Sequence, residues 1–311
     1  MNAKNKKIGF IGQGWIGKNY ADDFEKRGYD IVRYSLDKKY IKNGGKIKDC
    51  DIVFIAVPTP TVKNVFDDSI VRSAIKKVGK GKIAVIKSTI LPGTTESIQK
   101  ANKDVYVMHS PEFLRSASAA YDSAHPERNI IGIPVDNNEY RKLAKEVLKT
   151  LPKAKFETVC TAKEAEIVKY AGNAFLYLKV VYINMLFDLA AKNGCDWNVV
   201  KKSFGADSRI GNSHLDPISS DGRGAGGHCF IKDFAAFENF YNECTKDEKG
   251  VKFLEGTAKK NIDLLVKSGK DINILMGVYG EEVINELQDK ISVNPQLIGA
   301  VQFHDGSKKN R

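Results

Sequence analysis

The first 160 residues alternate short apolar runs with segments of helical pattern. In order, the runs read KIGFIG, DIVRYSL, DIVFIAVP, KIAVIKST, DVYVMHS and NIIGIP, and most are nearly continuous in valine and isoleucine. Strands this apolar are typically buried on both faces, in a parallel sheet that helices cover on either side. The alternation therefore predicts a doubly wound α/β domain over residues 1–160.

Three glycines follow the first run, in the segment KIGFIGQGWIG. Gly12, Gly14 and Gly17 form a GxGxxG pattern between a predicted strand and a predicted helix. Glycines at these points allow a tight turn, close approach of a pyrophosphate and close helix–strand packing, while the helix N-terminus attracts negative charge. The segment predicts a Rossmann-like domain that binds a dinucleotide.

The end of the second run bears on which dinucleotide is bound. An acidic residue there accepts hydrogen bonds from the adenosine ribose, but the segment IVRYSLDKK places Ser35 at this point. A small hydroxyl among Arg33 and two lysines suits the 2′-phosphate of NADP, whereas Asp37 suits NAD if the strand ends two residues later. A solvated turn is the third alternative, and the residues alone leave all three open.

Polar residues also follow the later strands, in AVPTPT (56–61) and KSTILPGTT (87–95). Ligands bind at the carboxyl ends of strands in open α/β sheets, so the hydroxyls of Thr59, Ser88 and Thr89 are candidates to contact a nicotinamide or a water. The alternative is that these hydroxyls only stabilise turns. In HSPEFLRSASAAYD (109–122), Glu112 is either a catalytic base or a helix-start residue that the helix dipole favours.

Residues 162–194 have apolar residues at helical spacing, contain no proline and end in Asn-Gly. They predict one long connecting helix or two shorter ones. Glu166, Lys169 and Asn173 share one face of this segment. A lysine and an asparagine there can polarise a substrate oxygen, although a solvated polar stripe has the same spacing.

A smaller helical region is expected over 195–265, interrupted by the glycine-rich segment GRGAGGHCFIKD (222–233). Alone, Cys229 in this segment is either a buried small residue beside a flexible turn or a nucleophile on a preorganised loop. The tail, 266–311, contains one strand-like run, INILMGVYG, and one short helix.

Composition excludes several classes of protein. With 42% hydrophobic and 28% charged residues, the 311-residue chain is typical of a soluble globular protein. No apolar run is expected to reach the length of a membrane span, and the N-terminal segment is expected to start a domain, not a signal peptide. The five scattered cysteines argue against a disulfide framework or structural zinc and for a reducing compartment. The net charge of +11 is attributed to solvated lysines or, alternatively, to binding of an anionic cofactor or substrate, and the sequence has no nucleic-acid-binding motif.

Taken in order, these segments resemble the UDP-glucose/GDP-mannose dehydrogenase family. The resemblance covers roughly residues 7–265 and is most specific in SPEFLR and in the Cys-x-x-Lys-Asp segment. It implies NAD-dependent oxidation of the C6 alcohol of a sugar nucleotide to a carboxylate, in two hydride transfers through a cysteine thiohemiacetal and thioester. It also implies a small-molecule nucleotide sugar as partner and a homodimer through the central helical region. With the composition, we expect no nucleic acid, no membrane, no metal and a cytoplasmic location.

The resemblance assigns roles to particular residues. Cys229 is the nucleophile, Lys169 and Asn173 stabilise the oxyanion, Asp233 and Thr89 position water, and Glu112 assists proton transfer. Cofactor binding is expected at Gly12, Gly14, Trp15, Ile16, Gly17, Ser35, Asp37, Val57, Pro58, Thr59, Thr89 and Lys232. Substrate binding is expected at Glu112, Phe113, Leu114, Arg115, Lys169, Asn173, Arg209 and Gly226, with Arg209 reaching the substrate in a two-fold dimer.

The chain also departs from the family. Ile231 replaces the usual proline, which predicts a less rigid catalytic loop, and Ser35 replaces the usual acid. The expected domains are 1–160 (dinucleotide binding), 161–265 (long helix and helical substrate or dimerisation region) and 266–311, a truncated remnant of the family's second nucleotide-binding domain. Two alternatives stay open: a hydroxy-acid dehydrogenase that uses Lys169 and Asn173 without covalent catalysis, and an inactive cofactor-binding protein.

Overall fold

The computed structural model describes residues 5–63, 65–219 and 222–293. The chain divides into two compact units. Unit 1 comprises residues 1–60 and 66–172, and unit 2 comprises residues 61–65 and 173–311. Each unit has its own hydrophobic core.

Unit 1 is built on a seven-stranded sheet in the order β2-β1-β3-β6-β7-β8-β9. All neighbouring strands pair in parallel except β7 and β8, which are antiparallel. The predicted strands and the α/β fold class are confirmed, while the edge strand β9 was not predicted because its residues are largely exposed and polar. The strands are β1 (Lys7–Ile11), β2 (Asp30–Tyr34), β3 (Ile52–Ile55), β6 (Ile83–Ile86), β7 (Tyr106–His109), β8 (Arg128–Ile133) and β9 (Phe156–Thr161).

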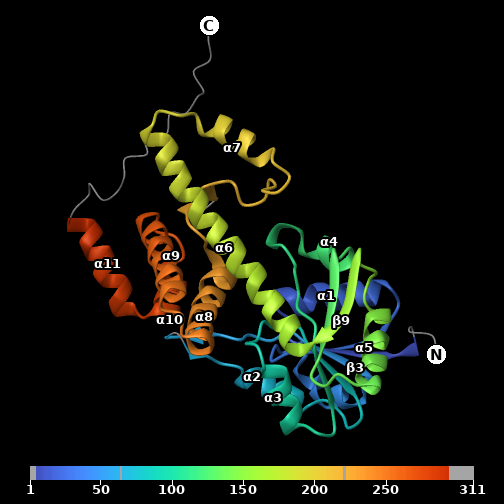
Figure 1. The fold of residues 1–311 in the computed structure, drawn as a ribbon. Helices are drawn as coiled ribbons and strands as arrows, with labels where there is room; N and C mark the ends of the chain where they lie inside the picture. Colours follow the sequence, from blue (N-terminus) through green and yellow to red (C-terminus); the bar gives the residue numbers. More distant parts are fainter. Residues whose placement is uncertain (1–4, 64, 220–221, 294–311) are drawn as a thin grey trace. The chain divides into compact units, whose positions relative to one another are not determined.

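Helices cover both faces of this sheet (Figure 1). One face packs against α1 (Trp15–Lys26) and α5 (Asn138–Thr150), in a cluster that includes Phe10, Phe24 and Phe54 with ring centroids 5.3 Å apart. The other face packs against η2 (Ile41–Asp49), α2 (Ser69–Ile75) and α3 (Thr94–Ala101). Each fully buried aromatic ring contributes about 1.5–3 kcal/mol, so burial on both faces accounts for the continuous apolar runs of the sequence.

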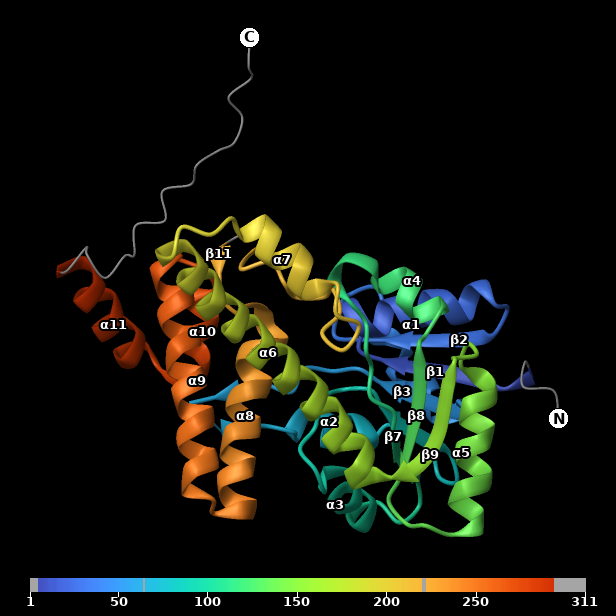
Figure 2. The same ribbon diagram turned by 45° about the horizontal axis from the view of Figure 1, so that its top comes forward.

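The strand order fixes where a ligand can bind in unit 1. β1 lies between β2 and β3, so the chain leaves β1 toward one side of the sheet and later returns on the other. Such a reversal opens a crevice at the carboxyl ends of the strands. The segments that follow β1, β3, β6 and β7 all begin at this edge (Figure 2). η3 (Ser116–Ser118) and α4 (Ala119–Ala124) belong to the last of these segments.

Unit 2 is mainly helical. Helix α6 (Ala162–Lys192) runs as one continuous helix from unit 1 into unit 2, which confirms the long helix predicted over 162–194. It is followed by α7 (Trp197–Gly205), α8 (Gly227–Thr245), α9 (Glu248–Lys267), α10 (Ile272–Tyr279) and α11 (Glu281–Val293). Short pairs of strands, β4 (Thr61–Val62) with β5 (Val65–Phe66) and β10 (Ile218–Ser219) with β11 (Gly222–Arg223), complete the described elements.

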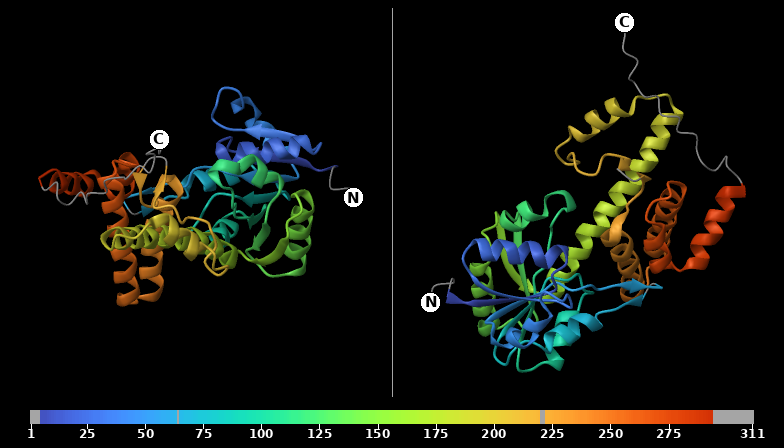
Figure 3. Two further views of the ribbon diagram at one scale, coloured as in Figure 1. Left: turned by 90° about the horizontal axis from the view of Figure 1, so that it is seen from above. Right: turned by 180° about the vertical axis from the view of Figure 1, so that it is seen from behind.

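Helices α8 and α9 form an antiparallel hairpin in unit 2 (Figures 1 and 3). Tyr177 of α6 stacks on Phe234 of α8 with ring centroids 3.9 Å apart, and both rings are buried. The amphipathic pattern of these segments therefore reflects burial against other helices, as a helical region predicts.

The prediction of a strand at INILMGVYG is wrong, because these residues form helix α10. A short apolar run satisfies strand and helix patterns equally well, and tertiary packing decides between them. Leu275 and Val278, three residues apart, are buried together with Ile231 of α8 and Leu265 of α9. Helical spacing brings both side chains to that core, and Gly280 at φ 101° ends the helix.

The expectation that no apolar run approaches the length of a membrane span is also wrong. Among the described residues, α6 alone is long and apolar enough to cross a membrane by length and composition. The core helix of a soluble protein satisfies the same criterion, and Tyr177, Val181 and Ile183 on α6 are buried inside the protein. The apolar composition of α6 is explained at least in part by this packing.

Candidate active site

The glycine motif forms the turn between β1 and α1. Gly12 has φ +92°, and a Cβ there would lie 2.0 Å from the Ala56 carbonyl oxygen. A Cβ at Gly17 would lie 2.0 Å from the Gly12 carbonyl oxygen, so both positions require glycine for packing. Gly14 caps α1 without a side-chain hydrogen bond, and the first turn, which includes Trp15 and Ile16, contains no acidic residue. The uncapped N–H groups and absent negative charge fit a pyrophosphate.

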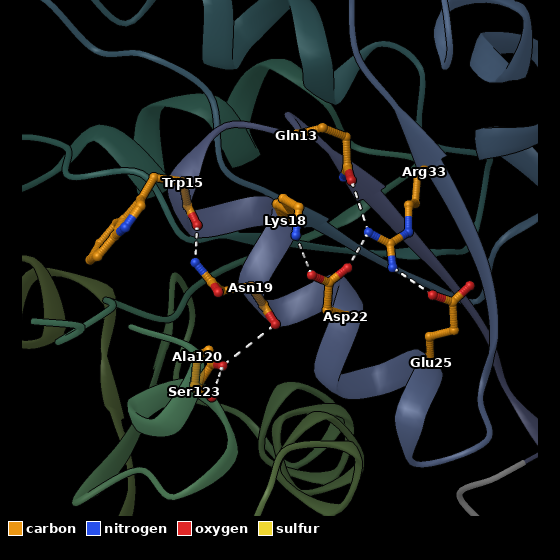
Figure 4. Close-up of polar contacts among 9 residues, drawn as sticks. All are labelled: Gln13, Trp15, Lys18, Asn19, Asp22, Glu25, Arg33, Ala120 and Ser123. Atoms are coloured by element: carbon orange, nitrogen blue, oxygen red, sulfur yellow. Dashed lines mark hydrogen bonds and ion pairs between the residues drawn. The ribbon is translucent and has the colours of Figure 1, made fainter. Parts of the chain in front are cut away.

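Arg33 of β2 does not supply the free cation that the sequence suggested for a 2′-phosphate. Its Nη1 lies 2.7 Å from Asp22 Oδ1 and 3.4 Å from Gln13 Oε1, and its Nη2 lies 2.8 Å from Glu25 Oε2. Figure 4 shows the guanidinium turned to these side chains, and Lys18 Nζ also contacts Asp22 at 2.6 Å. The Arg33 side chain is 11% exposed. Two carboxylates on α1 therefore hold and neutralise this arginine.

Ser35 and Asp37 follow the end of β2 at Tyr34. The Ser35 hydroxyl donates to Asp37 Oδ2 at 2.8 Å, and the Asp37 N–H donates to Ser35 Oγ at 3.3 Å. The strand does not extend to Asp37, but this turn brings its carboxylate back to the strand end.

Hydroxyl groups join the segments after β3 and β6. The Val57 N–H donates to Ser88 Oγ at 2.9 Å, and the Ser88 hydroxyl donates to the Val57 carbonyl at 2.7 Å. Thr59 Oγ1 donates to the Thr89 carbonyl at 2.8 Å. The Ser88 and Thr59 hydroxyls are therefore bonded to backbone groups of these segments, which fixes Pro58 and Thr89 after the carboxyl ends of β3 and β6.

Glu112 and Lys169 form a buried ion pair within unit 1. Lys169 Nζ lies 2.8 Å from Glu112 Oε1 and 2.8 Å from the Glu112 carbonyl oxygen. The other carboxylate oxygen accepts from the Leu114 N–H at 2.8 Å. Both side chains are less than one-tenth exposed, so the pair is a fixed, desolvated acid–base couple after β7.

Two other residues of the SPEFLR segment, Phe113 and Arg115, also have fixed partners. The Arg128 guanidinium lies 3.7 Å from the centroid of the Phe113 ring. Arg115 Nη2 lies 2.5 Å from Asp122 Oδ1, and this hydrogen bond lowers the pKa of Asp122 to about 2. Arg115 is therefore paired in this structure, although its side chain remains largely exposed.

Sequence reasoning missed a buried lysine, Lys87, whose charge interacts with that of Glu112. Lys87 is 3% exposed, its Nζ donates to Ser110 Oγ at 2.9 Å, and it lies 4.5 Å from the centroid of the Tyr20 ring. Burial lowers the pKa of Lys87 to about 7. The available signal was a lysine at the end of the buried run IAVI, where a charged residue must be enclosed or must reach a polar partner.

Unit 2 contains the other predicted catalytic groups. Asn173 Nδ2 of α6 donates to Asp233 Oδ2 at 2.6 Å, and Lys232 Nζ pairs with Asp233 Oδ1. Cys229 is exposed and lies four residues before Asp233 on α8, so the two share one helix face. On α6, Asn173 lies four residues after Lys169.

The expectation of a loop around Cys229 is wrong, because α8 begins at Gly227. Cys229 therefore lies in the first turn of a helix, where the macrodipole favours negative charge. Ile231, which replaces the family's proline, is 1% exposed and packs in the core of unit 2. The segment from Gly227 is helical, so the expected loss of rigidity in a loop does not apply.

The glycines before Cys229 pack against the end of α9. Asn261 exchanges two hydrogen bonds with the Ala225 backbone, at 2.7 and 3.0 Å. A Cβ at Gly226 would lie 2.2 Å from Asp271 Oδ2, which also accepts from the Gly227 N–H at 2.7 Å. Asn261 and Asp271 thus fix the entry to α8, and no sequence motif indicated either residue.

Two other residues considered from the sequence, Glu166 and Arg209, contact none of the groups described so far. Glu166 accepts hydrogen bonds from the N–H groups of Gly93 and Thr95 at the start of α3, so it is a buried cap of that helix. Burial raises the pKa of Glu166. Arg209 is exposed and pairs with Asp207 at 2.6 Å. Among the residues that the structure describes, no group of His, Cys, Asp and Glu side chains is arranged to bind a metal.

Residues 38–152 match the NAD binding domain of the UDP-glucose/GDP-mannose dehydrogenase family, and residues 163–262 match its central domain. The chain belongs to this family. The family resemblance and the dinucleotide-binding domain predicted from the sequence are thereby confirmed.

Individual relatives agree with the family assignment. The chain is 32% identical over 229 residues to a UDP-glucose 6-dehydrogenase of Rickettsia conorii, covering 70% of this chain and 50% of that protein. It is 35% identical over 199 residues to a UDP-glucose 6-dehydrogenase of Rhizobium meliloti, covering 60% and 45%. A UDP-glucose dehydrogenase structure from Pyrobaculum islandicum superposes with a TM-score of 0.71 at 27% identity, covering 87% of this chain and 70% of that one. The chain spans about half the length of these two curated relatives.

Proposed function

We propose that this chain oxidises the C6 alcohol of a UDP-glucose-like sugar nucleotide to the uronate, using NAD. The supporting observation is in unit 2, where Cys229 and Asp233 share one face of α8 and Asp233 accepts from Asn173 of α6. A thiol beside a fixed carboxylate and amide suits covalent oxidation of an aldehyde. The names of the relatives support the substrate class.

NAD supplies the hydride acceptor when bound, and the chain's residues fit it. The glycine turn with Trp15 and Ile16 would hold the pyrophosphate, and Ser35 with Asp37 the ribose. Val57, Pro58, Thr59 and Thr89 would contact the nicotinamide half, and Lys232 would add positive charge.

The remaining roles concern the substrate. Loss of hydride from C6 gives an aldehyde, and the Cys229 sulfur adds to its carbon to form a thiohemiacetal. Loss of a second hydride gives a thioester, which water hydrolyses to the carboxylate and the free thiol. Lys169 and Asn173 would stabilise the oxyanion, while Asp233 and Thr89 would position water.

Glu112 would transfer protons in these steps. Lys169 Nζ donates to its Oε1 and the Leu114 N–H to its Oε2, so the carboxylate is fixed in place for such transfers. Phe113, Leu114, Arg115, Gly226 and Arg209 would contact the substrate, Arg209 from the partner in a dimer.

Turnover by the 311-residue chain tests the proposal. With NAD and UDP-glucose, or a UDP-sugar with a free C6 alcohol, we expect NADH to form and the uronate to appear in a ratio of two NADH per acid. Free glucose serves as the control and should not react. A chain that binds NAD tightly yet oxidises no nucleotide sugar contradicts the proposal, and oxidation of a small hydroxy acid instead supports the non-covalent alternative.

The proposed enzyme acts as a homodimer in the cytoplasm. The exposed apolar side chains of α6 support the dimer. The large apolar side chains Phe175, Tyr182, Met185 and Leu189 are all more than half exposed. With the half-buried Leu178 they follow the 3,4 spacing of a helix–helix seam.

The seam predicts an effect on assembly. We expect Tyr182→Glu to raise the dissociation constant of the dimer by roughly a hundredfold, because each copy buries a charge. Sedimentation across a concentration series measures it. Ala191→Glu, an exposed position off the seam, is the matched control and should leave assembly unchanged. Equal behaviour of both variants argues against this interface.

A further inference from the structure

Residues 268–271 connect α9 to α10 and pack against the glycine-rich segment that leads into α8; we call them the clamp segment. Ser268 Oγ accepts from the Arg223 N–H at 3.0 Å. A Cβ at Gly222, whose φ is +133°, would lie 2.6 Å from the Ser268 Cβ. The backbone before α8 therefore approaches the clamp segment so closely that a side chain at Gly222 would displace it.

The clamp segment places two opposite charges at the start of α8. Lys270 is 8% exposed, and its Nζ donates to Ser219 Oγ and lies 3.5 Å from the Gly224 carbonyl oxygen. Asp271 Oδ2 accepts from the N–H of Gly227, the first residue of α8, at 2.7 Å. A buried ammonium and a carboxylate thus hold the turn on both sides of the point where the helix begins.

The two charges take the place of a side chain that the helix lacks. Gly226 is the N-cap of α8, and a Cβ there would lie 2.2 Å from Asp271 Oδ2, 2.5 Å from Lys270 Cε and 3.3 Å from Lys270 Nζ. An N-cap side chain normally reaches the N–H groups of the second and third helical residues. Cys229 is the third residue of α8, so both charges lie at the helical turn that contains it.

The two charges act on the Cys229 thiol in opposite directions. The thiolate, not the thiol, is the nucleophile. A nearby cation favours the thiolate, and a nearby carboxylate disfavours it. The helical rise of about 1.5 Å per residue places Cys229 only about 3 Å further along the axis than Gly227, and charges interact appreciably over roughly 10 Å at physiological salt.

We propose that Lys270 and Asp271 are positioning residues for Cys229. The Lys270 ammonium promotes the thiolate, the Asp271 carboxylate limits it, and the clamp segment fixes the turn from which α8 starts. The inference rests on the nucleophilic role that the proposed function gives to Cys229. Its test needs no turnover, because a thiolate reacts with an alkylating reagent whether or not the chain oxidises a sugar nucleotide.

Other charged groups near α8 are the same in every variant compared. On the segment itself, His228 precedes Cys229, Lys232 pairs with Asp233, and Arg223 pairs with Asp188 of α6. Helices α9 and α10 and strand β4 also pack against α8. Their titratable groups toward the start of α8 are Lys259, Lys260, Asp263 and Lys267 in the second half of α9, Tyr279 of α10, and Lys63 after β4.

Alkylation of Cys229 by iodoacetamide in the full chain tests the inference. Mass spectrometry of the peptide that contains Cys229 gives the rate at each pH, and the pH of half-maximal rate measures how readily the thiolate forms. Lys270→Met should raise this midpoint and Asp271→Asn should lower it, each by about half a pH unit or more. Asparagine keeps an oxygen that can accept from the Gly227 N–H, so Asp271→Asn removes mainly the charge.

The opposite signs separate a charge effect from a structural one, because a looser turn would move both midpoints in the same direction. Lys270→Arg keeps the cation and should leave the midpoint unchanged. Glu243→Gln and Lys252→Met make the same charge changes at the far end of the α8–α9 hairpin (Figure 1), and they should also leave it unchanged. Thermal melting checks that each variant is folded.

Two results would overturn the inference: midpoints that shift in the same direction, or shifts no larger than those of the control variants. If Lys270→Met does not fold, an unchanged or raised midpoint in Asp271→Asn is enough to overturn it. Opposite shifts in a chain that oxidises no nucleotide sugar support the inference and contradict only the proposed function.

Discussion

Replacing Cys229 by alanine should reduce uronate formation on the order of a thousandfold or more, because no other group of the proposed site can form a thioester. The first oxidation needs no thiol, so the aldehyde should still form. Trapping the aldehyde with hydroxylamine would therefore yield one NADH per trapped product. The measurement follows NADH and the sugar products together.

Helix α8 supplies the control for this experiment. Cys244 is also exposed and lies in the last turn of the same helix. Cys244→Ala should leave both oxidations unchanged, which separates loss of the nucleophile from general loss of a thiol. Acid formation that survives in Cys229→Ala would falsify covalent catalysis and favour the non-covalent alternative.

Lys87 should make the stability of unit 1 depend on pH. Its folded pKa of about 7 lies below its ordinary value of 10.5 because burial disfavours the ammonium. Between these values the unfolded chain binds more protons than the folded chain, so stability rises with pH. We expect the free energy of unfolding to increase by about 2 kcal/mol from pH 7.5 to 9 relative to a Lys87→Met variant.

The groups around Lys87 set the limits of this window. Burial raises the pKa of Tyr20 well above 10, and burial lowers the pKa of His109 to about 3, so neither titrates between pH 7.5 and 9 in the folded chain. Ser110, Glu112 and Lys169 complete the polar surroundings. Lys87→Met removes the amine and should also remove the dependence.

Urea unfolding at several pH values measures this effect. Trp15 lies in unit 1 and Trp197 in unit 2, so a Trp197→Phe background makes fluorescence report on unit 1. Lys103→Met, at an exposed position of unit 1, is the control and should follow the unmodified chain. The same pH dependence in Lys87→Met and in the control would contradict the assignment.

Local patterns predicted much of unit 1. Continuous apolar runs predicted the buried strands, because a strand that is covered on both faces needs an apolar residue at nearly every position. The glycine motif predicted the turn at Gly12, where packing against Ala56 leaves no room for a Cβ. The helix over 162–194 followed from its periodicity and the absence of proline.

Other features depend on contacts between distant residues. The pairing of Glu112 with Lys169 joins positions 57 residues apart, and that of Asn173 with Asp233 joins positions 60 apart. The spacing of residues within one segment does not indicate which residues of a distant segment they will contact. For the same reason Asn261 and Asp271 were not predicted, although they hold the entry to α8.

The sequence by itself determined the α/β class, the dinucleotide turn, the long helix and the family, because each depends on local periodicity or on the order of short segments. Only the tertiary structure decided that INILMGVYG is a helix, that Cys229 lies in the first turn of α8 and that Arg33 is bound by Asp22 and Glu25. In each case the local pattern was compatible with two outcomes. Burial of apolar side chains and pairing of charges from elsewhere in the chain favoured one of them.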